Sequence, residues 1–353
     1  MELNVDLLVA GCNTRCRHCY VRGGPGRRMP LEDLRLCLGK LDEIAARLPF
    51  PASFTLDNEP IAHPEIGAIL DAASRTAHIR HYHHGMTTGI ALMGRPDRAE
   101  LIRRYLDCGC RDFGITLHGG EAHHDEIVRR AGAFRTSIEA AAFLRDMGAE
   151  LNVSLMLNRF FPGDAEEIDR VLRQLEPTFV YFAIPNYTPH ADMPDFEPYR
   201  ATLSELQALK PRLQDWGQDA DALLERAAQS TVAAARERLE GGLSLRALFE
   251  EEQSELYCTV HPDCRLYLGN TGVETACLGD LRRLDATATA EILSKAPGNR
   301  DYGAFYDPAD LPKEAALIGA LERMDPGLLY ADLPSVLYRG LAELHIPTRI
   351  LDT

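Results

Sequence analysis

The stretch Cys12-Asn13-Thr14-Arg15-Cys16-Arg17-His18-Cys19 decides how the rest of this sequence is interpreted. Its cysteines are spaced by four and three residues and follow an apolar run, 5–10, that is typical of a strand. Three thiolates on one short loop can hold three irons of a cubane iron–sulfur cluster. The fourth iron then has no ligand from this loop, and an open metal position is typical of a reactive site rather than a structural one.

Two plainer uses of these cysteines are a zinc site and a disulfide scaffold. Zinc knuckles usually carry paired Cys-x2-Cys half-sites, and the sequence has no second pair of this kind. Nine cysteines without a signal segment at the N-terminus favour a reducing, cytoplasmic location over a disulfide-rich secreted protein. Of the three uses, we favour the iron–sulfur cluster.

Length and charge narrow the function further. The chain has 353 residues, enough for one large domain and a smaller one, and 45% of them are hydrophobic. The net charge of −15 repels phosphate backbones, so we expect no nucleic-acid partner. No apolar run reaches the roughly eighteen residues that a membrane span needs, so we expect no membrane association.

Strand-like and helical runs alternate through the first half of the chain. The predicted strands cover 3–10, 52–56, 79–86, 111–117, 151–157 and 178–184. This alternation predicts an α/β fold of parallel βα units with right-handed crossovers, closed into a partial (β/α)6 TIM-like barrel. Sites in such barrels form at the carboxyl ends of the strands. The candidate residues at these ends are Cys12, Glu59, Thr116 and Asn158.

The cysteine loop matches C-x3-C-x-Φ-C, where Φ is aromatic, and thereby resembles the radical S-adenosylmethionine (radical SAM) superfamily, with His18 in the aromatic position. The resemblance implies that Cys12, Cys16 and Cys19 bind a [4Fe-4S] cluster whose open iron binds S-adenosylmethionine. An electron from the cluster would cleave this cofactor to a 5′-deoxyadenosyl radical that takes hydrogen from the substrate. The implied electron donor is a reductant such as flavodoxin or ferredoxin.

Other segments are similar to cofactor-binding segments of this superfamily. Asp57-Asn58-Glu59-Pro60 resembles the superfamily segment Gly-Gly-Glu-Pro. Asn58 takes the place of a glycine in this segment, and Asn tolerates the positive φ that glycine allows. A strand-to-helix turn punctuated by proline is the plainer interpretation. Either Arg129 or Arg130 could pair with the methionyl carboxylate. The residues that the resemblance places around the cofactor are His18, Asn58, Glu59, Thr88, Thr116, His118, Arg129 and Asn158.

The C-terminal part resembles a degenerate SPASM or twitch extension. Cys258, Cys264 and Cys277 flank a hairpin signal at 266–274 and could hold a second iron–sulfur cluster, although no later cysteine supplies a fourth ligand. We expect a radical SAM partial barrel at 1–185, a helical linker or insert at 186–252, and a twitch/SPASM-like α+β extension with a β-hairpin at 253–353.

The expected function is a radical SAM enzyme acting on a small-molecule substrate, either a metabolite or a natural-product intermediate. Side chains expected on the substrate side are His83, Tyr187 and His190. The first alternative is a maturase of a ribosomally made peptide. Such relatives often carry a leader-binding domain before the barrel, whereas the first predicted strand here starts at residue 3. The second alternative is an iron–sulfur sensor or electron carrier, which would need no S-adenosylmethionine pocket.

Overall fold

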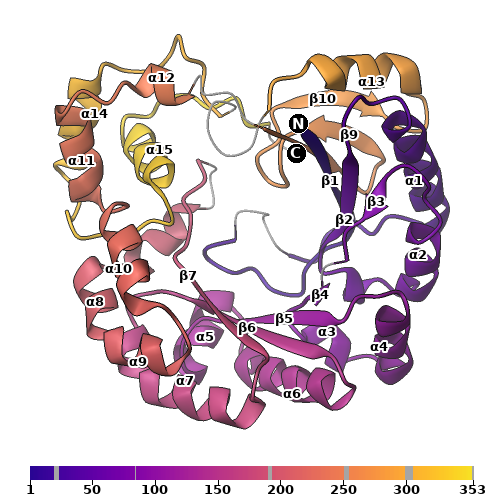
Figure 1. The fold of residues 1–353 in the computed structure, drawn as a ribbon, viewed down its shortest axis with the longest axis horizontal. Helices are drawn as coiled ribbons and strands as arrows, with labels where there is room; N and C mark the ends of the chain where they lie inside the picture. The colour runs from indigo at the N-terminus through magenta and orange to yellow at the C-terminus, as the bar shows by residue number, and fades with distance from the viewer. Residues whose placement is uncertain (20–23, 84, 190–192, 250–253, 299–304, 352–353) are drawn as a thin grey trace.

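Parallel strands form a curved wall in the computed structural model, and helices lie on its outer side (Figure 1). The structure describes residues 1–19, 24–83, 85–189, 193–249, 254–298 and 305–351. The strands of the barrel are β1 (Glu2–Ala10), β2 (Ala52–Asn58), β3 (Arg80–His81), β4 (Gly85–Met86), β5 (Asp112–Leu117), β6 (Glu150–Met156) and β7 (Phe179–Ala183). All of their pairings are parallel, which confirms the predicted α/β barrel-like fold.

The third predicted strand, 79–86, is interrupted. Its first piece, β3, pairs with β2, and its second piece, β4, pairs with β5, so the barrel consists of two separate sheets. The His81 ring stacks on Phe54, with 4.8 Å between ring centroids, and the His83 ring lies 4.2 Å from that of His81. The two imidazoles share one side of the chain, as alternation predicted, and that side faces a buried core phenylalanine.

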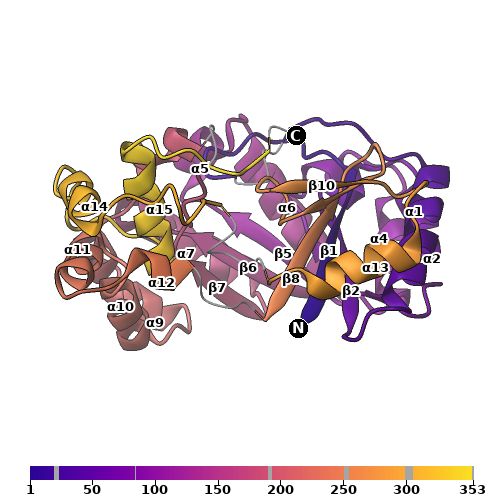
Figure 2. The ribbon, with the colours of Figure 1, turned by 90° about the horizontal axis from the view of Figure 1, so that it is seen from above.

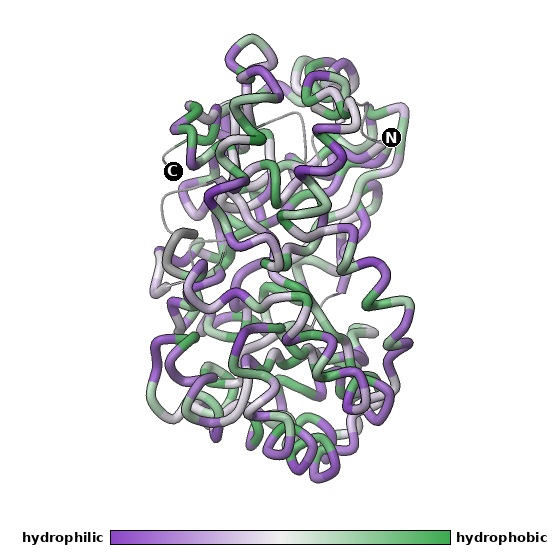
Figure 3. The backbone as a smooth tube through the Cα atoms, turned by 90° about the vertical axis from the view of Figure 1, so that its left-hand side faces the viewer, coloured by the Kyte–Doolittle hydropathy of each residue, from purple (hydrophilic) through white to green (hydrophobic). Residues whose placement is uncertain are grey.

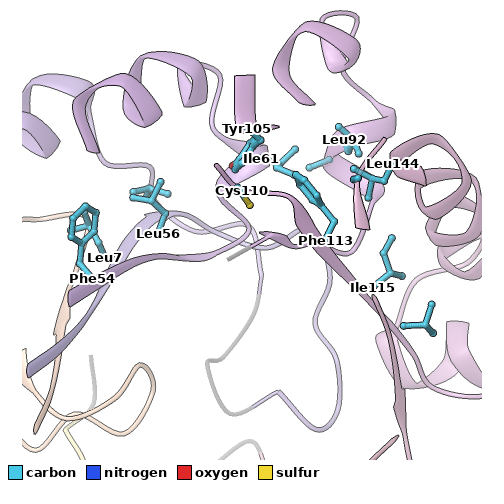
Figure 4. Close-up of a cluster of buried hydrophobic side chains, with 14 of the residues drawn as sticks. Leu7, Phe54, Leu56, Ile61, Leu92, Tyr105, Cys110, Phe113, Ile115 and Leu144 are labelled. Carbon is cyan, nitrogen blue, oxygen red and sulfur yellow. The ribbon is translucent and has the colours of Figure 1, made fainter. Parts of the chain in front are cut away.

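Helices follow the strands in βα order and cover the outer face of the sheets. They are α1 (Leu31–Ala45), α2 (Ile66–Ala73), α3 (Ile90–Met93), α4 (Arg98–Asp107), α5 (Glu121–Val128), α6 (Ala133–Asp146) and α7 (Phe161–Leu175). Figure 4 shows part of the core between helices and strands, where Leu7 and Phe54 lie at one end and Ile115 at the other. Cys37 of α1 is buried in this core, as predicted.

The sheet continues past β1 into the C-terminal region. Strand β8 (Glu255–Val260) runs parallel to β1, and β9 (Arg265–Leu268) and β10 (Ala276–Asp280) follow it in antiparallel order. The predicted hairpin is therefore present, with a longer connection than a tight two-residue turn. Helix α13 (Ala286–Lys295) lies beside α1 over this extended sheet (Figure 2).

A second group of helices lies on the other side of the molecule in Figure 1. They are α8 (Leu203–Ala208), α9 (Lys210–Asp215), α10 (Ala220–Ala228), α11 (Val232–Glu240), α12 (Leu245–Phe249), α14 (Glu314–Leu321) and α15 (Leu333–Glu343). Hydrophobic and hydrophilic stretches alternate along the backbone (Figure 3), as in elements that bury one face only. In the described part of the chain, no helix has the length and apolar character that crossing a bilayer requires. The domain boundaries proposed from the sequence stay a prediction.

Asp6 points from β1 into the interior of the barrel among polar groups. Its Oδ1 accepts a hydrogen bond from the Thr55 hydroxyl at 3.1 Å, and its Oδ2 lies 3.2 Å from the Thr271 hydroxyl. The same hydroxyl lies 2.9 Å from Oδ2 of Asp57, so the two carboxyl groups are neighbours. Burial, followed by the charge of Asp57, raises the pKa of Asp6 from 3.8 to about 7.

This shift predicts a pH dependence of stability. Between pH 4 and 7 the folded protein keeps a proton on Asp6 that the unfolded chain has lost, so stability falls as pH rises through this window, by up to about 1.4 kcal/mol per pH unit. Asp6→Asn is neutral at every pH and should lack this fall. Urea unfolding at pH 5 and pH 8 measures the difference, with Asp310→Asn at an exposed site as the control. Parallel pH profiles for wild type and Asp6→Asn would contradict the assignment.

Candidate functional site

A cavity of about 350 Å³ lies at the carboxyl ends of the barrel strands. The three thiols of the loop after β1, those of Cys12, Cys16 and Cys19, line it. The hydroxyl of Thr14 lies 3.1 Å from Sγ of Cys12, and Sγ of Cys16 donates to it at 3.4 Å. The structure thus brings the predicted cluster loop to one cavity together with residues from the ends of four further strands.

The chemistry of this donor set suits an iron–sulfur cluster. Burial raises the pKa of Cys12, and raises that of Cys16 to about 12, so neither thiol ionises readily without a cation beside it. Among the described residues that line the cavity there is no lysine or arginine to supply that charge. Iron does supply it, because a coordinated thiol is deprotonated by the metal. The residues present therefore fit the metal group that the sequence motif implies.

The backbone of the cysteine loop is fixed by its neighbours. The Arg17 amide donates to the Ile127 carbonyl at 2.9 Å, and the Arg130 guanidinium donates to the Asn13 carbonyl at 2.9 Å. A Cβ at residue 11 would come within 2.1 Å of the Gly26 amide nitrogen, so only glycine fits at Gly11. These contacts hold the cysteine loop against α5 and against the segment after the loop that contains Gly26.

Glu59 joins the two sheets at the edge that carries the cavity. It follows β2 of one sheet, is 1% exposed and lines the cavity. Its Oε1 accepts from the Thr87 hydroxyl at 2.5 Å, and its Oε2 accepts from the Thr88 amide and hydroxyl at 2.8 and 2.9 Å. These threonines follow β4 of the other sheet. Burial raises the pKa of Glu59, against the opposing effect of these hydrogen bonds.

Asn58 adopts the backbone conformation that its place in the motif requires. Its φ is +68°, in the left-handed region that Asn tolerates better than other residues with a Cβ. Its side chain lines the cavity, and its Oδ1 is buried without a hydrogen-bond partner in the described part of the structure. An unsatisfied buried acceptor at a cavity is free to receive a donor from a ligand.

Three histidines form one side of the cavity. The ring centroids of His18 and His118 are 4.6 Å apart, and those of His118 and His124 are 5.3 Å apart. Burial lowers the pKa of all three, to about 4 for His18 and His124, so the rings are neutral at pH 7. His118 is 3% exposed, and no described residue hydrogen-bonds to its Nδ1. Thr88 and Thr116, also predicted, line the same cavity.

Two residues predicted to contact the cofactor do not line the cavity. Asn158 is fully buried: its Nδ2 donates to the His118 carbonyl at 2.7 Å, and its Oδ1 accepts from the Phe160 amide at 3.0 Å. Its side chain therefore holds the end of β5, and a contact of Asn158 with the cofactor stays a prediction. Arg129 ends α5 with φ +57° and is also absent from the lining. The alternative, Arg130, holds the cysteine loop through Asn13.

Of the side chains predicted on the substrate side, the two that the structure describes, His83 and Tyr187, are not in the lining of this cavity. His83 packs on His81, away from the cavity lining. Tyr187 is buried in the second hydrophobic cluster, with the guanidinium of Arg339 5.8 Å from its ring centroid. His190 lies outside the described residues. Alternation and loop position could not distinguish a packed aromatic residue from one that faces a ligand.

The three cysteines predicted to hold a second cluster are Cys258, Cys264 and Cys277. The structure does not bring them together. Cys258 pairs with Leu268, whereas Cys277 pairs with the residue before it, Tyr267. Successive residues of a strand point to opposite faces, so these two thiols lie on opposite faces of the sheet. Cys264 is buried and interacts with Cys37 of α1.

Several residues at the site were not singled out from the sequence. Thr87 follows β4, and no local sequence pattern identifies it as a partner of Glu59, which is 28 residues earlier in the chain. Thr14 lies inside the cysteine motif at a position that the motif leaves free. The further lining residues that were missed are Leu56, Met86, Ile90, His124, Val128, Ala133, Ser137 and Met156.

Comparison with known proteins agrees with this geometry. Residues 7–175 match the family model described as the radical SAM superfamily. Residues 7–175 thus form a segment of the radical SAM superfamily. This match covers β1 through α7, and thus the cysteine loop together with every other part of the cavity lining.

Proteins similar to this chain include the mycofactocin maturase MftC of Mycobacterium ulcerans, which is 28% identical over 165 residues. That match covers 45% of this chain and 41% of MftC. Structures of the same fold include anSMEcpe with bound AdoMet and Cp18Cys peptide, with a TM-score of 0.53, 14% identity and coverage of 97% and 96%. Streptococcus suis SuiB bound to precursor peptide SuiA gives a TM-score of 0.54, 11% identity and coverage of 95% and 75%.

The conformation of Asn58 makes a testable prediction. Alanine in the left-handed region costs about 1–2 kcal/mol, whereas glycine adopts it freely. Asn58→Ala should therefore unfold at lower urea concentration than Asn58→Gly, with a difference in unfolding free energy of about 1 kcal/mol. Both variants lack the Asn58 amide, so the glycine variant is the matched control. Equal stability of the two variants would show that φ at residue 58 is not constrained.

Proposed function

We propose that this protein is a radical SAM enzyme that modifies a peptide. The radical SAM assignment rests on one observation: one cavity at the strand ends is lined by the three thiols, the buried carboxylate of Glu59 and the unsatisfied amide oxygen of Asn58. Cys12, Cys16 and Cys19 would hold a [4Fe-4S] cluster. When bound, this cluster with S-adenosylmethionine supplies one-electron cleavage of the cofactor and hydrogen abstraction from the substrate. The proposal includes one cluster only, because Cys258 and Cys277 lie on opposite faces of their sheet.

The side chains of the cavity would bind and orient the cofactor. Glu59 offers a carboxylate to an ammonium group: its Oε1 accepts one threonine bond and retains a lone pair, whereas its Oε2 already accepts two. Asn58 Oδ1 offers a second acceptor. The neutral rings of His18 and His118, tilted by 45° to each other, line the cavity and leave less room there for water. A dry site strengthens every polar contact made within it.

A peptide substrate is supported by the relatives rather than by a residue of this chain. MftC is a maturase, SuiB was solved with a precursor peptide, and anSMEcpe was solved with a bound peptide. The sequence alone favoured a small molecule, and that remains the second candidate. The lining of the cavity does not distinguish the two candidates, so substrate trials have to separate them.

The function is tested with anaerobically reconstituted protein, S-adenosylmethionine and a strong reductant. Wild type should bind about four irons and release 5′-deoxyadenosine. The variant with Cys12, Cys16 and Cys19 changed to alanine should lose both properties, and Cys108→Ala, outside the cavity lining, should keep them. Full iron content in the triple variant would contradict the cluster assignment. Peptides encoded beside the gene should change mass in this reaction; faster 5′-deoxyadenosine release with small metabolites and unchanged peptides would favour the second candidate.

Glu59 gives a separate prediction about the cofactor. A hydrogen bond to a charged group is worth about 1.5–3 kcal/mol. Glu59→Ala should therefore weaken S-adenosylmethionine binding by roughly ten- to a hundredfold while iron content stays constant. Thr87→Val is the control, because it removes one of the threonine bonds and keeps the carboxylate. If Thr87→Val weakens binding as much as Glu59→Ala, Glu59 acts by holding the two sheets together and not by contacting the cofactor.

A further inference from the structure

Thr14 occupies the centre of the cysteine loop without exposure to water. Its side chain is 4% exposed and lines the cavity. Its hydroxyl oxygen lies 3.1 Å from Sγ of Cys12 and 3.4 Å from Sγ of Cys16. These two sulfurs are the side-chain partners that the described structure gives to this hydroxyl.

The direction of these hydrogen bonds depends on the state of the sulfurs. When the cysteines are free thiols, the S–H of Cys16 donates to the hydroxyl oxygen of Thr14. A sulfur that ligates iron has no proton to donate, so the hydroxyl of Thr14 becomes the donor in any contact with it. One hydroxyl carries one proton, and the sulfur of Cys12, at the shorter distance, is the nearer acceptor.

A hydrogen bond to a ligating sulfur changes the electronic properties of a cluster. Reduction adds negative charge that is spread partly over the sulfurs, and a donor stabilises this charge more than it stabilises the oxidised state. Hydrogen bonds to the sulfurs and exclusion of solvent are two of the determinants of cluster potential. Because Thr14 is 4% exposed, the low dielectric around its hydroxyl strengthens the bond.

We propose that the Thr14 hydroxyl donates a hydrogen bond to a cluster-ligating sulfur, that of Cys12 first, and thereby raises the reduction potential of the cluster. Thr14 is a positioning residue in this role, since it acts on the cluster through its cysteine ligand. The inference rests on the proposed cluster at Cys12, Cys16 and Cys19. It explains why a polar side chain occupies a buried position between two thiols, where an aliphatic one would pack as well.

The test is a redox titration of the reconstituted cluster, followed by electron paramagnetic resonance, in wild type, Thr14→Val and Thr14→Ser. Valine keeps the branched shape and removes the donor, whereas serine keeps the donor. Thr14→Val should make reduction of the cluster about tenfold less favourable. For a one-electron couple this lowers the reduction potential by about 59 mV. Thr14→Ser should stay close to wild type. Equal potentials in wild type and Thr14→Val would overturn the proposal.

A second readout does not depend on the titration. The Fe–S stretching bands in the resonance Raman spectrum should shift between H2O and D2O by less in Thr14→Val than in wild type. If the valine variant takes up no iron, Thr14→Ala is titrated in its place. Loss of iron in both hydroxyl-free variants but not in Thr14→Ser supports the proposal, and loss in all three overturns it. If wild type itself takes up no cluster, the proposed function fails first, so the two failures are distinguishable.

Discussion

The carboxylate of Glu59 is the contact on which the architecture of the site depends. The barrel consists of two sheets, because its third strand is interrupted between β3 and β4. No backbone ladder joins these sheets in the described part of the interruption, so side chains must do so. Glu59 stands at the end of β2 and accepts hydrogen bonds from Thr87 and Thr88 after β4. It therefore fixes the distance between the cysteine loop, which follows β1, and the segments from the second sheet.

Asn158 plays the corresponding part within the second sheet. It holds the carbonyl of His118 at the end of β5 and the amide of Phe160 at the start of α7. A buried polar side chain with all its partners in the backbone rigidifies the loops that it joins. The cavity thus rests on two such residues, Glu59 and Asn158. Of these, Glu59 alone also faces the space where a ligand would lie.

Local sequence patterns predicted part of this arrangement, and the parts that depend on contacts between distant residues were not predictable. Strand alternation and helical spacing predicted the βα order because each element buries one continuous face, and the cysteine motif predicted the loop because its chemistry is local. Positive φ at Asn58 was predictable for the same local reason. The break in the third strand was not, because it depends on which strands the two pieces pair with, β2 for one and β5 for the other. The same limit applies to Arg129, His83 and Tyr187, whose directions are set by neighbours distant in sequence.

The pairing of β8 with β1 connects the C-terminal region to the site. Residues 255–260 extend the same sheet that ends in the cysteine loop, so the loop after β9 comes to lie beside the first two strands. Thr271 of that loop contacts both Asp6 and Asp57, and Asp57 lines the cavity. Two carboxyl groups this close cannot both ionise cheaply in a buried site, and a threonine hydroxyl can donate to only one of them at a time. The protonation of this pair therefore couples the C-terminal loop to the side of the cavity that carries Asn58 and Glu59. A change in charge at Asp57 would alter the field at the cavity and the hold on the C-terminal loop together.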